Sequence, residues 1–257
     1  MTTGAHVVID RLIAGGVDVC FANPGTSEMH FVAALDSAPQ MRAVLCPFEG
    51  VATGAADGYA RIAGRPAATL LHLGPGMANG LANLHNARRA HSPVVNVVGD
   101  HATYHQKLDA PLQSDIEALG NWLNGSVHRP ASGAELGAAV DAAILSTTVS
   151  RHIATLILPA DLSWSDSESD GADEPFAAPK PVDVDITSGA EVLKSHGEHT
   201  VLLLGGPATT AAGLRAAARI CAATGAKALV ETFPARLARG QGVPDIPRLG
   251  YFAEQAQ

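Results

Sequence analysis

Aromatic side chains are scarce in this 257-residue sequence, and so are clusters of basic residues and long apolar runs. Only 4% of the residues are Phe, Trp or Tyr, and the formal net charge is −8. A chain without Lys/Arg clusters cannot neutralise a phosphate backbone, so nucleic acid is excluded as a partner. The apolar runs are strand-sized, which is too short to span a bilayer, so no membrane partner is expected either.

Cysteine is also rare. Cys20, Cys46 and Cys221 are widely spaced in apolar stretches and match neither a disulfide framework nor a zinc site. The N-terminus lacks the basic start and the apolar core of a signal peptide. We therefore expect three reduced core thiols in a cytoplasmic protein. His101 and His105 are four residues apart but have no third ligand beside them, so no metal site is predicted.

The sequence does contain a regular alternation of strand-like and helix-like segments. Short apolar runs such as 94–98 alternate with Ala-rich amphipathic stretches, which predicts a doubly wound parallel α/β sheet. Over residues 163–182 the composition becomes acidic and rich in Ser and Pro, which is typical of a solvated linker. We expect a first domain over 1–162, this linker, and part of a second, Rossmann-like α/β domain over 183–257.

Glu49 lies at a predicted strand-to-helix junction. The apolar run 43–45 predicts a short buried strand, and an Ala-rich helix is predicted to begin near Glu49. Gly50, Gly54 and Gly58 recur every fourth residue, so they share one helical face and leave it without side chains. Each glycine costs a helix about 1 kcal/mol relative to Ala, so we expect another group to lie very close to this face.

Three motifs follow one another in the first half of the chain. They are Asn23-Pro24-Gly25-Thr26-Ser27-Glu28, then Phe48-Glu49-Gly50 with Ala56-Asp57-Gly58-Tyr59-Ala60, and then Leu71-His72-Leu73-Gly74-Pro75-Gly76-Met77-Ala78-Asn79-Gly80. In this order and spacing they resemble the N-terminal pyrimidine-binding domain of thiamine diphosphate-dependent 2-oxo-acid enzymes. Within that superfamily the chain is most similar to benzoylformate decarboxylase and to acetolactate synthase large subunits. The resemblance is strong over residues 3–160 and weak beyond them.

The resemblance implies a chemical task for Glu49. In this family a buried carboxylate forms a hydrogen bond with a ring nitrogen of the aminopyrimidine and promotes its imino tautomer, while the cofactor supplies the electron sink. A carboxylate flanked by Phe48 and Val51 in an apolar pocket would suit this task. The resemblance implies catalytic roles for Glu49 and His72, cofactor contacts at Asn23, Pro24, Gly25, Glu49, Gly76 and Asn79, and substrate contacts at Thr26, His72 and His101.

Ordinary structural explanations remain open for the same residues. Pro24-Gly25 fits plain turn chemistry, and His72, at the end of a strand predicted over 67–73, fits a hydrogen-bonded structural residue. An acid in a first helical turn, such as Glu49, is favourable with the helix dipole alone. The stretch 74–80 has the spacing G-x-G-x-x-x-G, one residue too long for a dinucleotide fingerprint. We expect it to form a loop and a helix start beneath the thiamine pyrimidine.

One part of the family pattern is missing. The resemblance implies a second site, for Mg²⁺ and the diphosphate of the cofactor, carried by a Gly-Asp-Gly motif and a later Asn. Because this sequence lacks that motif, we expect the Mg²⁺ ligands in a C-terminal domain outside it and no activity from this fragment alone. Gly205-Gly206-Pro207 lacks the other glycines of a nucleotide fingerprint, so FAD is not expected. The family places its cofactor between subunits, which implies a homodimer or homotetramer.

The predicted activity is thiamine diphosphate-dependent decarboxylation of a small-molecule 2-oxo acid. The product is either released as an aldehyde or ligated to a second 2-oxo acid, so the enzyme is a carboxy-lyase or an acetolactate synthase-type transferase. A non-catalytic or split-enzyme subunit that keeps the pyrimidine-binding fold is the alternative. A buried acid beside a glycine face would serve no purpose in such a scaffold, which favours the enzyme.

Overall fold

The computed structural model describes residues 2–167 and 182–256, and it divides the chain into two units, Met1–Pro179 and Lys180–Gln257. Most of the expected linker, 163–182, lies outside the described residues. Its first two residues, Ser163 and Trp164, belong to a short helix of the first unit.

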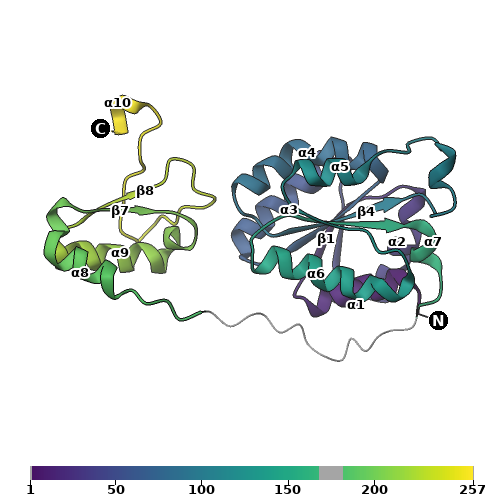
Figure 1. Ribbon diagram of the computed structural model, residues 1–257, viewed down its shortest axis with the longest axis horizontal. Helices are drawn as coiled ribbons and strands as arrows, with labels where there is room; N and C mark the ends of the chain where they lie inside the picture. The colour runs from purple at the N-terminus through teal and green to yellow at the C-terminus, as the bar shows by residue number, and fades with distance from the viewer. Residues whose placement is uncertain (1, 168–181, 257) are drawn as a thin grey trace. The chain divides into compact units, whose positions relative to one another are not determined.

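The first unit is built on six parallel strands in the order β2-β1-β3-β4-β6-β5 (Figure 1). This arrangement confirms the predicted doubly wound parallel sheet. The strands are β1 (Val19–Asn23), β2 (Arg42–Leu45), β3 (Ala67–Leu71), β4 (Val94–Asp100), β5 (Ser126–His128) and β6 (Ala154–Pro159). The helices are α1 (Gly4–Ala14), α2 (Met29–Leu35), α3 (Glu49–Ala63), α4 (Leu73–Arg89), α5 (Ile116–Trp122), α6 (Leu136–Thr148) and α7 (Ala160–Trp164). Short 3-10 turns lie at Thr26–Glu28, Gln106–Leu108 and Gly133–Glu135.

Helices cover both faces of this sheet, so the first unit has two apolar cores. In Figure 1, α3, α4 and α5 lie on one face and α1 and α6 on the other. Alternate strand residues serve the two faces: Val95 and Val97 of β4 pack toward α1 and α6, while Val94 and Val98 pack toward α3 and α4. Strands buried on both faces explain the continuous apolar runs in the sequence.

The structure corrects three local expectations. The strand predicted to be buried at 43–45 is β2, an edge strand whose Leu45 is 78% exposed. The strand predicted over 67–73 ends at Leu71, and the stretch expected to form a loop and a helix start, 74–80, lies wholly inside α4. The short strand β5 was not predicted from the sequence, because it has only three residues and no fully buried side chain.

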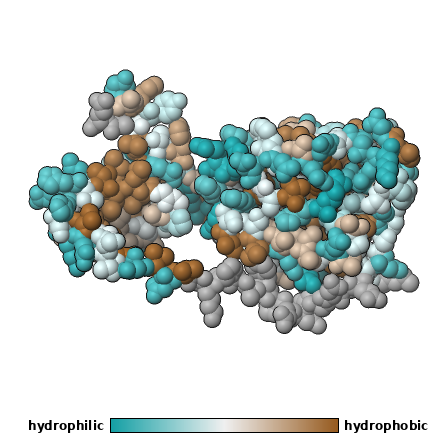
Figure 2. Space-filling view, in the orientation of Figure 1, coloured by the Kyte–Doolittle hydropathy of each residue, from teal (hydrophilic) through white to brown (hydrophobic). Residues whose placement is uncertain are grey.

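The second unit holds two parallel strands, β7 (Val201–Leu204) and β8 (Lys227–Val230). Its helices are α8 (Thr187–His196), α9 (Ala211–Thr224) and α10 (Ala253–Ala256), with 3-10 turns at Gly197–His199 and Gly206–Thr209. Val201 and Leu203 of β7 are 53% and 61% exposed, and Figure 2 shows apolar residues gathered over the two strands. A parallel sheet is normally covered on both faces. Within the described residues, no layer covers the face that carries Val201 and Leu203.

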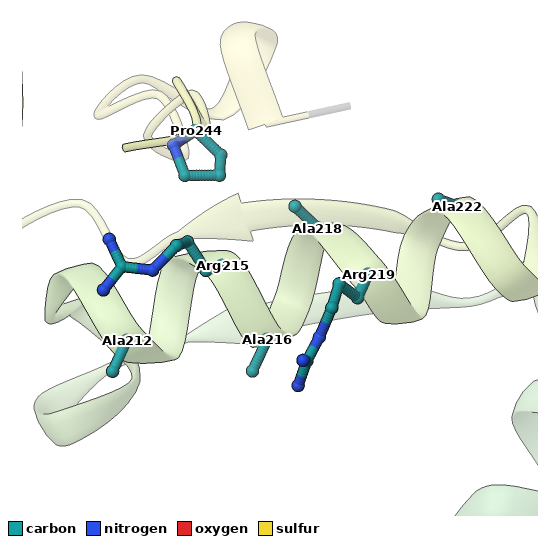
Figure 3. Close-up of a pocket in the computed structure, with 7 residues that line it drawn as sticks. All are labelled: Ala212, Arg215, Ala216, Ala218, Arg219, Ala222 and Pro244. Atoms are coloured by element: carbon teal, nitrogen blue, oxygen red, sulfur yellow. The ribbon is translucent and has the colours of Figure 1, made fainter. Parts of the chain in front are cut away.

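A hollow of about 530 Å³ lies on the surface of α9. Figure 3 shows that alanines of α9 form much of its lining, together with Arg215, Arg219 and Pro244. The hollow belongs to the second unit alone. None of the residues predicted for a functional site lines it.

The three cysteines are free thiols in two different environments. Cys20 and Cys46 are buried, and burial raises the pKa of Cys20 to about 12 and holds the pKa of Cys46 above its ordinary value. Cys221 is partly exposed on α9, so the expectation of a third core thiol was wrong. Across residues 2–167 and 182–256, no helix combines the length and the apolar character needed to cross a bilayer.

Candidate functional site

The predicted site residues gather where the carboxyl ends of β1, β2 and β3 reach the edge of the sheet. In a doubly wound sheet ligands bind where neighbouring strands send their connections to opposite faces, and β1 and β3 form such a pair. Asn23, the last residue of β1, is in register with Leu71, the last residue of β3. His72 follows β3 directly, and Glu49 follows the turn after β2. The topology therefore brings segments distant in sequence to one edge.

Glu49 is the first residue of α3, and it is only 8% exposed. The amide Nδ2 of Asn79 donates a hydrogen bond to its Oε2 at 3.0 Å. A Cβ added at Gly76 would lie 3.1 Å from Oε1, so the absence of a side chain there leaves room beside the carboxylate. Oε1 forms no hydrogen bond to any described residue. One carboxylate oxygen is therefore oriented by the protein and the other is available to a ligand.

The surroundings of Glu49 differ from the apolar pocket that the sequence suggested. Phe48 and Val51 are 49% and 53% exposed, so within this unit they border the carboxylate without enclosing it. The N-terminus of α3 also favours a negative charge at this position through the helix dipole. The acid is thus low in exposure without being enclosed in an apolar pocket.

The glycine face of α3 is only partly occupied. A Cβ at Gly54 would meet the Asn83 side chain of α4 at 3.0 Å, and the Asn83 amide donates to the carbonyl of Gly50 at 2.6 Å. On the facing helix, a Cβ at Gly80 would lie 2.7 Å from Thr53. These contacts bring α3 and α4 close together, as expected. The expectation was wrong at Gly58, which is exposed and has no atom within 4 Å of an added Cβ.

His72 is held by a carboxylate that the sequence analysis did not assign to the site. Its Nδ1 lies 2.8 Å from Oε2 of Glu28, and the same oxygen accepts the backbone N–H of Gly25 at 2.7 Å. The Glu28 side chain is 1% exposed, whereas that of His72 is 25% exposed. Burial raises the pKa of Glu28, although the Gly25 N–H and His72 both act in the opposite direction.

The backbone around His72 is shaped for this contact. A Cβ at Gly25 would lie 2.4 Å from the imidazole ring, so only glycine leaves room for the ring to lie against the turn. Leu73, directly after His72, adopts a left-handed φ of 54°, which an ordinary residue avoids. The chain thus turns sharply from β3 into α4 at His72. A sequence signal for Glu28 did exist, because an acid three residues after a helix cap is the spacing of a capping box.

The structure brings together only part of the predicted set. Glu49, Asn79, Gly76, His72 and Gly25 form one connected group, since Gly76 borders both Glu49 and the Cβ of His72, at 3.1 and 3.4 Å from an added Cβ. Asn23 and Pro24 lead from β1 into this group along the chain. Thr26 is exposed in the 3-10 turn, and no hydrogen bond between described residues joins its side chain to the group. Its assignment to the substrate stays a prediction.

His101 lies in the loop after β4, and its Nε2 pairs with the carbonyl of Pro111 at 3.0 Å. This loop is anchored by Asp100, which is 1% exposed and accepts hydrogen bonds from Gln106 at 3.1 Å and Arg129 at 2.8 Å. Contact of His101 with a substrate stays a prediction. Among the described residues there is no cluster of three His, Cys, Asp or Glu side chains that could hold a metal ion.

A family model described as thiamine pyrophosphate enzyme, N-terminal TPP binding domain, matches residues 2–121. Residues 2–121 are therefore similar to the N-terminal TPP binding domain of these enzymes. The match includes Glu28, Glu49, His72 and Asn79, and it ends before β5. The resemblance seen in the three motifs is therefore confirmed for the N-terminal TPP-binding domain.

Two relatives show how far the similarity extends. The chain is 62% identical over 254 residues to a protein named acetolactate synthase large subunit IlvX from Mycobacterium tuberculosis, an alignment that covers 98% of this chain and 49% of the relative. It is 33% identical over 135 residues to benzoylformate decarboxylase from Pseudomonas aeruginosa, covering 52% of this chain and 25% of the relative. The chain thus spans about half the length of the first of these relatives.

Solved structures agree with this fold. A thiamine diphosphate-dependent 4-hydroxybenzoylformate decarboxylase from Rhodococcus jostii superposes with a TM-score of 0.77 at 22% identity, covering 90% of this chain and 45% of the other. A thiamin diphosphate-dependent enzyme from Mycobacterium smegmatis gives a TM-score of 0.75 at 26% identity, with 90% and 45% coverage. The fold class assigned to the TPP-binding domain is thereby confirmed.

Proposed function

We propose that this chain is the pyrimidine-binding half of a thiamine diphosphate-dependent enzyme that decarboxylates a 2-oxo acid. The observation that carries the proposal is the Glu49 carboxylate, which is 8% exposed, oriented by Asn79 through Oε2 and free of any described partner at Oε1. When bound, thiamine diphosphate supplies the electron sink for loss of CO₂.

The residues present fit the aminopyrimidine part of the cofactor. A ring nitrogen needs an oxygen that can share a proton with it, and Oε1 of Glu49 is such an oxygen. An aromatic ring also needs a space without side chains, and Gly76 leaves one beside this oxygen. We assign Asn79 to orienting Glu49, and Asn23, Pro24, Gly25 and Gly76 to backbone contacts with the cofactor.

The described residues do not fit the diphosphate and its Mg²⁺. They contain no cluster of metal-ligating side chains. We propose that the Mg²⁺ ligands lie in the half of the relatives that this chain does not cover, and that the intact enzyme is a cytoplasmic homodimer or homotetramer without a functional FAD.

His72 favours release of the product as an aldehyde. Its side chain is 25% exposed and lies beside Gly76, which also borders Glu49, so an imidazole is available where a proton is needed after CO₂ has left. Carboligation of the acetolactate synthase type is the second candidate, and the 62% identity to a protein of that name supports it. In either reaction, Thr26 and His101 are assigned to contacts with the 2-oxo acid.

A reconstituted enzyme tests this proposal. The chain is joined to the second half of the Mycobacterium tuberculosis relative, which lies beyond the aligned region. The chimera is incubated with thiamine diphosphate, Mg²⁺ and either pyruvate or benzoylformate, and the products are identified by mass spectrometry. We expect CO₂ and an aldehyde or a ligated acid, and no turnover by this chain alone.

The matched control is Glu49→Gln in the same chimera. Gln keeps the size of the side chain and its hydrogen bond to Asn79 but removes the proton-sharing oxygen. We expect turnover to fall by a factor of roughly 10² to 10⁴, the usual contribution of a positioned acid or base. A folded chimera that binds cofactor yet turns over neither substrate, or a Glu49→Gln chimera with unchanged turnover, would contradict the proposal.

A further inference from the structure

The two ring nitrogens of His72 lie in different environments. Nδ1 faces Oε2 of Glu28 at 2.8 Å. Nε2 has no hydrogen-bond partner among the described residues, and the side chain is 25% exposed, whereas that of Glu28 is 1% exposed. Nδ1 is therefore held by the protein, and Nε2 is available to bind a ligand or transfer a proton. The partner of the held nitrogen decides which of the two carries the proton in the neutral ring.

Glu28 can only accept at the oxygen that faces His72. Oε2 already accepts the Gly25 N–H at 2.7 Å, and at a pH above the raised pKa of Glu28 the ionised carboxylate has no donor to offer. The Nδ1 atom must then be the donor. A neutral imidazole in water favours the opposite form, with its proton on Nε2. The contact with Glu28 therefore reverses the intrinsic preference of the ring.

We propose that Glu28 is a positioning residue that holds His72 in its Nδ1-protonated tautomer and so presents Nε2 to the substrate. Two glycines make room for this pair. A Cβ at Gly99, in β4, would lie 1.7 Å from Oε1 of Glu28, and a Cβ at Gly25 would lie 2.4 Å from the His72 ring. Side chains at either position would force the carboxylate or the ring away from the other.

The other oxygen of Glu28 supports a role beyond packing. Oε1 is buried and has no hydrogen-bond partner among the described residues. A buried unpaired carboxylate oxygen is destabilising, so a carboxylate serves stability poorly at this position. Its hydrogen bonds to Gly25 and His72 are both made by Oε2. The arrangement orients the imidazole and lowers the stability of the fold.

The tautomer defines which bonds change in the proposed reaction. Nε2 takes a proton from solvent and transfers it to the carbon that has lost CO₂, so an Nε2–H bond breaks and a C–H bond forms. The Nδ1 proton stays between the ring and Glu28 throughout. This step rests on the proposed function, whereas the tautomer is a property of the chain alone.

Nitrogen NMR of the full 257-residue chain tests the inference without cofactor. The chain is labelled with ¹⁵N-histidine, the His72 signals are assigned by their loss in His72→Gln, and the ring-nitrogen shifts are read at a pH where the ring is neutral. We expect a pyrrole-type Nδ1 and a pyridine-type Nε2. A pyridine-type Nδ1 in the unmodified chain would overturn the inference.

Three variants separate positioning from packing. Glu28→Leu removes the acceptor, and we expect the proton of the neutral ring to move to Nε2. Glu28→Gln keeps the shape and is the fallback if the Leu variant does not fold; we expect a mixture of tautomers. Asp57→Asn is the matched control, because Asp57 is another buried carboxylate, paired with Ser92 and Arg61, and its loss is expected to leave the His72 shifts unchanged. Unchanged shifts in both Glu28 variants would refute the role of Glu28.

The chimera adds a kinetic test. In Glu28→Gln we expect kcat to fall at least tenfold, with KM for the 2-oxo acid within a factor of about three. An inactive parent chimera would refute the proposed function while the NMR result still decides the inference. An Nδ1-protonated His72 combined with unchanged kcat in Glu28→Gln would overturn the catalytic part of the proposal.

Discussion

Two acidic regions lie at the same edge of the first sheet, and they are built in opposite ways. Glu49 begins a helix, has one oxygen held by the exposed side chain of Asn79 and has the other without a described partner. Glu28 is enclosed, with one oxygen shared by Gly25 and His72 and the other pressed toward Gly99. The comparison suggests that one acid is arranged to meet a molecule from outside and the other to hold a side chain of the protein itself.

Isotope exchange would separate the two acids most strongly. In the chimera with bound thiamine diphosphate, we expect Glu49→Gln to slow hydrogen–deuterium exchange at the thiazolium carbon by a factor of roughly 10² to 10⁴, because the proton-sharing oxygen is lost. Glu28→Gln should leave this rate within a factor of about three. Quenched-flow NMR measures both rates. Equal slowing in the two variants would erase the distinction between the regions.

Steric crowding is the next largest expected effect. Gly99→Ala would place a Cβ 1.7 Å from Glu28 Oε1 in a fully buried strand. We expect the free energy of unfolding to fall by about 1–3 kcal/mol, as for other overpacked interiors. Urea denaturation followed by circular dichroism measures the change.

Gly58→Ala is the matched control for that substitution. Gly58 lies inside α3 with nothing within 4 Å of the added Cβ, so the variant should gain about 1 kcal/mol through helix propensity. An unaffected Gly99→Ala variant would show that the crowding inferred around Glu28 is wrong. A destabilised Gly58→Ala variant would show that an added Cβ destabilises the chain even where nothing lies within 4 Å, so the loss at Gly99 could not be assigned to crowding.

Glu28 should also change how the free energy of unfolding depends on pH. Burial raises its pKa in the folded state above the ordinary value of about 4.5. At a pH between the ordinary pKa and the raised pKa of the folded state, the folded chain holds a proton on Glu28 that the unfolded chain has lost. The free energy of unfolding therefore falls as pH rises through this window. Glu28→Gln should lack this fall. Denaturation midpoints of both proteins, measured at steps from pH 4 upward, should diverge in favour of the variant, and parallel curves would contradict the burial of an acid here.

The smallest expected effect concerns the partner of Glu49. Asn79 is exposed, so Asn79→Ala should change the free energy of unfolding by less than about 0.5 kcal/mol. In the chimera the same variant should lower kcat about tenfold, because the carboxylate loses its orienting hydrogen bond. A large loss of stability would mean that Asn79 supports the fold and not the site.

Much of the fold could be predicted because the relevant signals are local. Strands buried on both faces give unbroken apolar runs, and Glu49 stands at a clear change from strand to helix. The burial predicted for β2 was wrong because only the order of strands, which depends on the whole chain, shows that β2 is an edge. A loop was expected before the helix start within 74–80 because the glycines and Pro75 of this stretch disfavour helix in isolation.

Most of the candidate site was accessible from the sequence. Glu49, His72, Gly76 and Asn79 were found through motifs, and the structure places them together. Glu28 was quoted within a motif but given no role, because its importance depends on a contact with His72, 44 residues away. Distant pairings of this kind arise from topology, which local patterns do not encode.

The left-handed backbone at Leu73 has a consequence for redesigning the candidate site. Because this φ belongs to Leu73 and not to His72, we expect the turn to survive replacement of the side chain at position 72. A library of replacements at this position would therefore project each new group into the same space. The products formed by variants that differ only in the side chain at position 72 could then be compared on the same backbone.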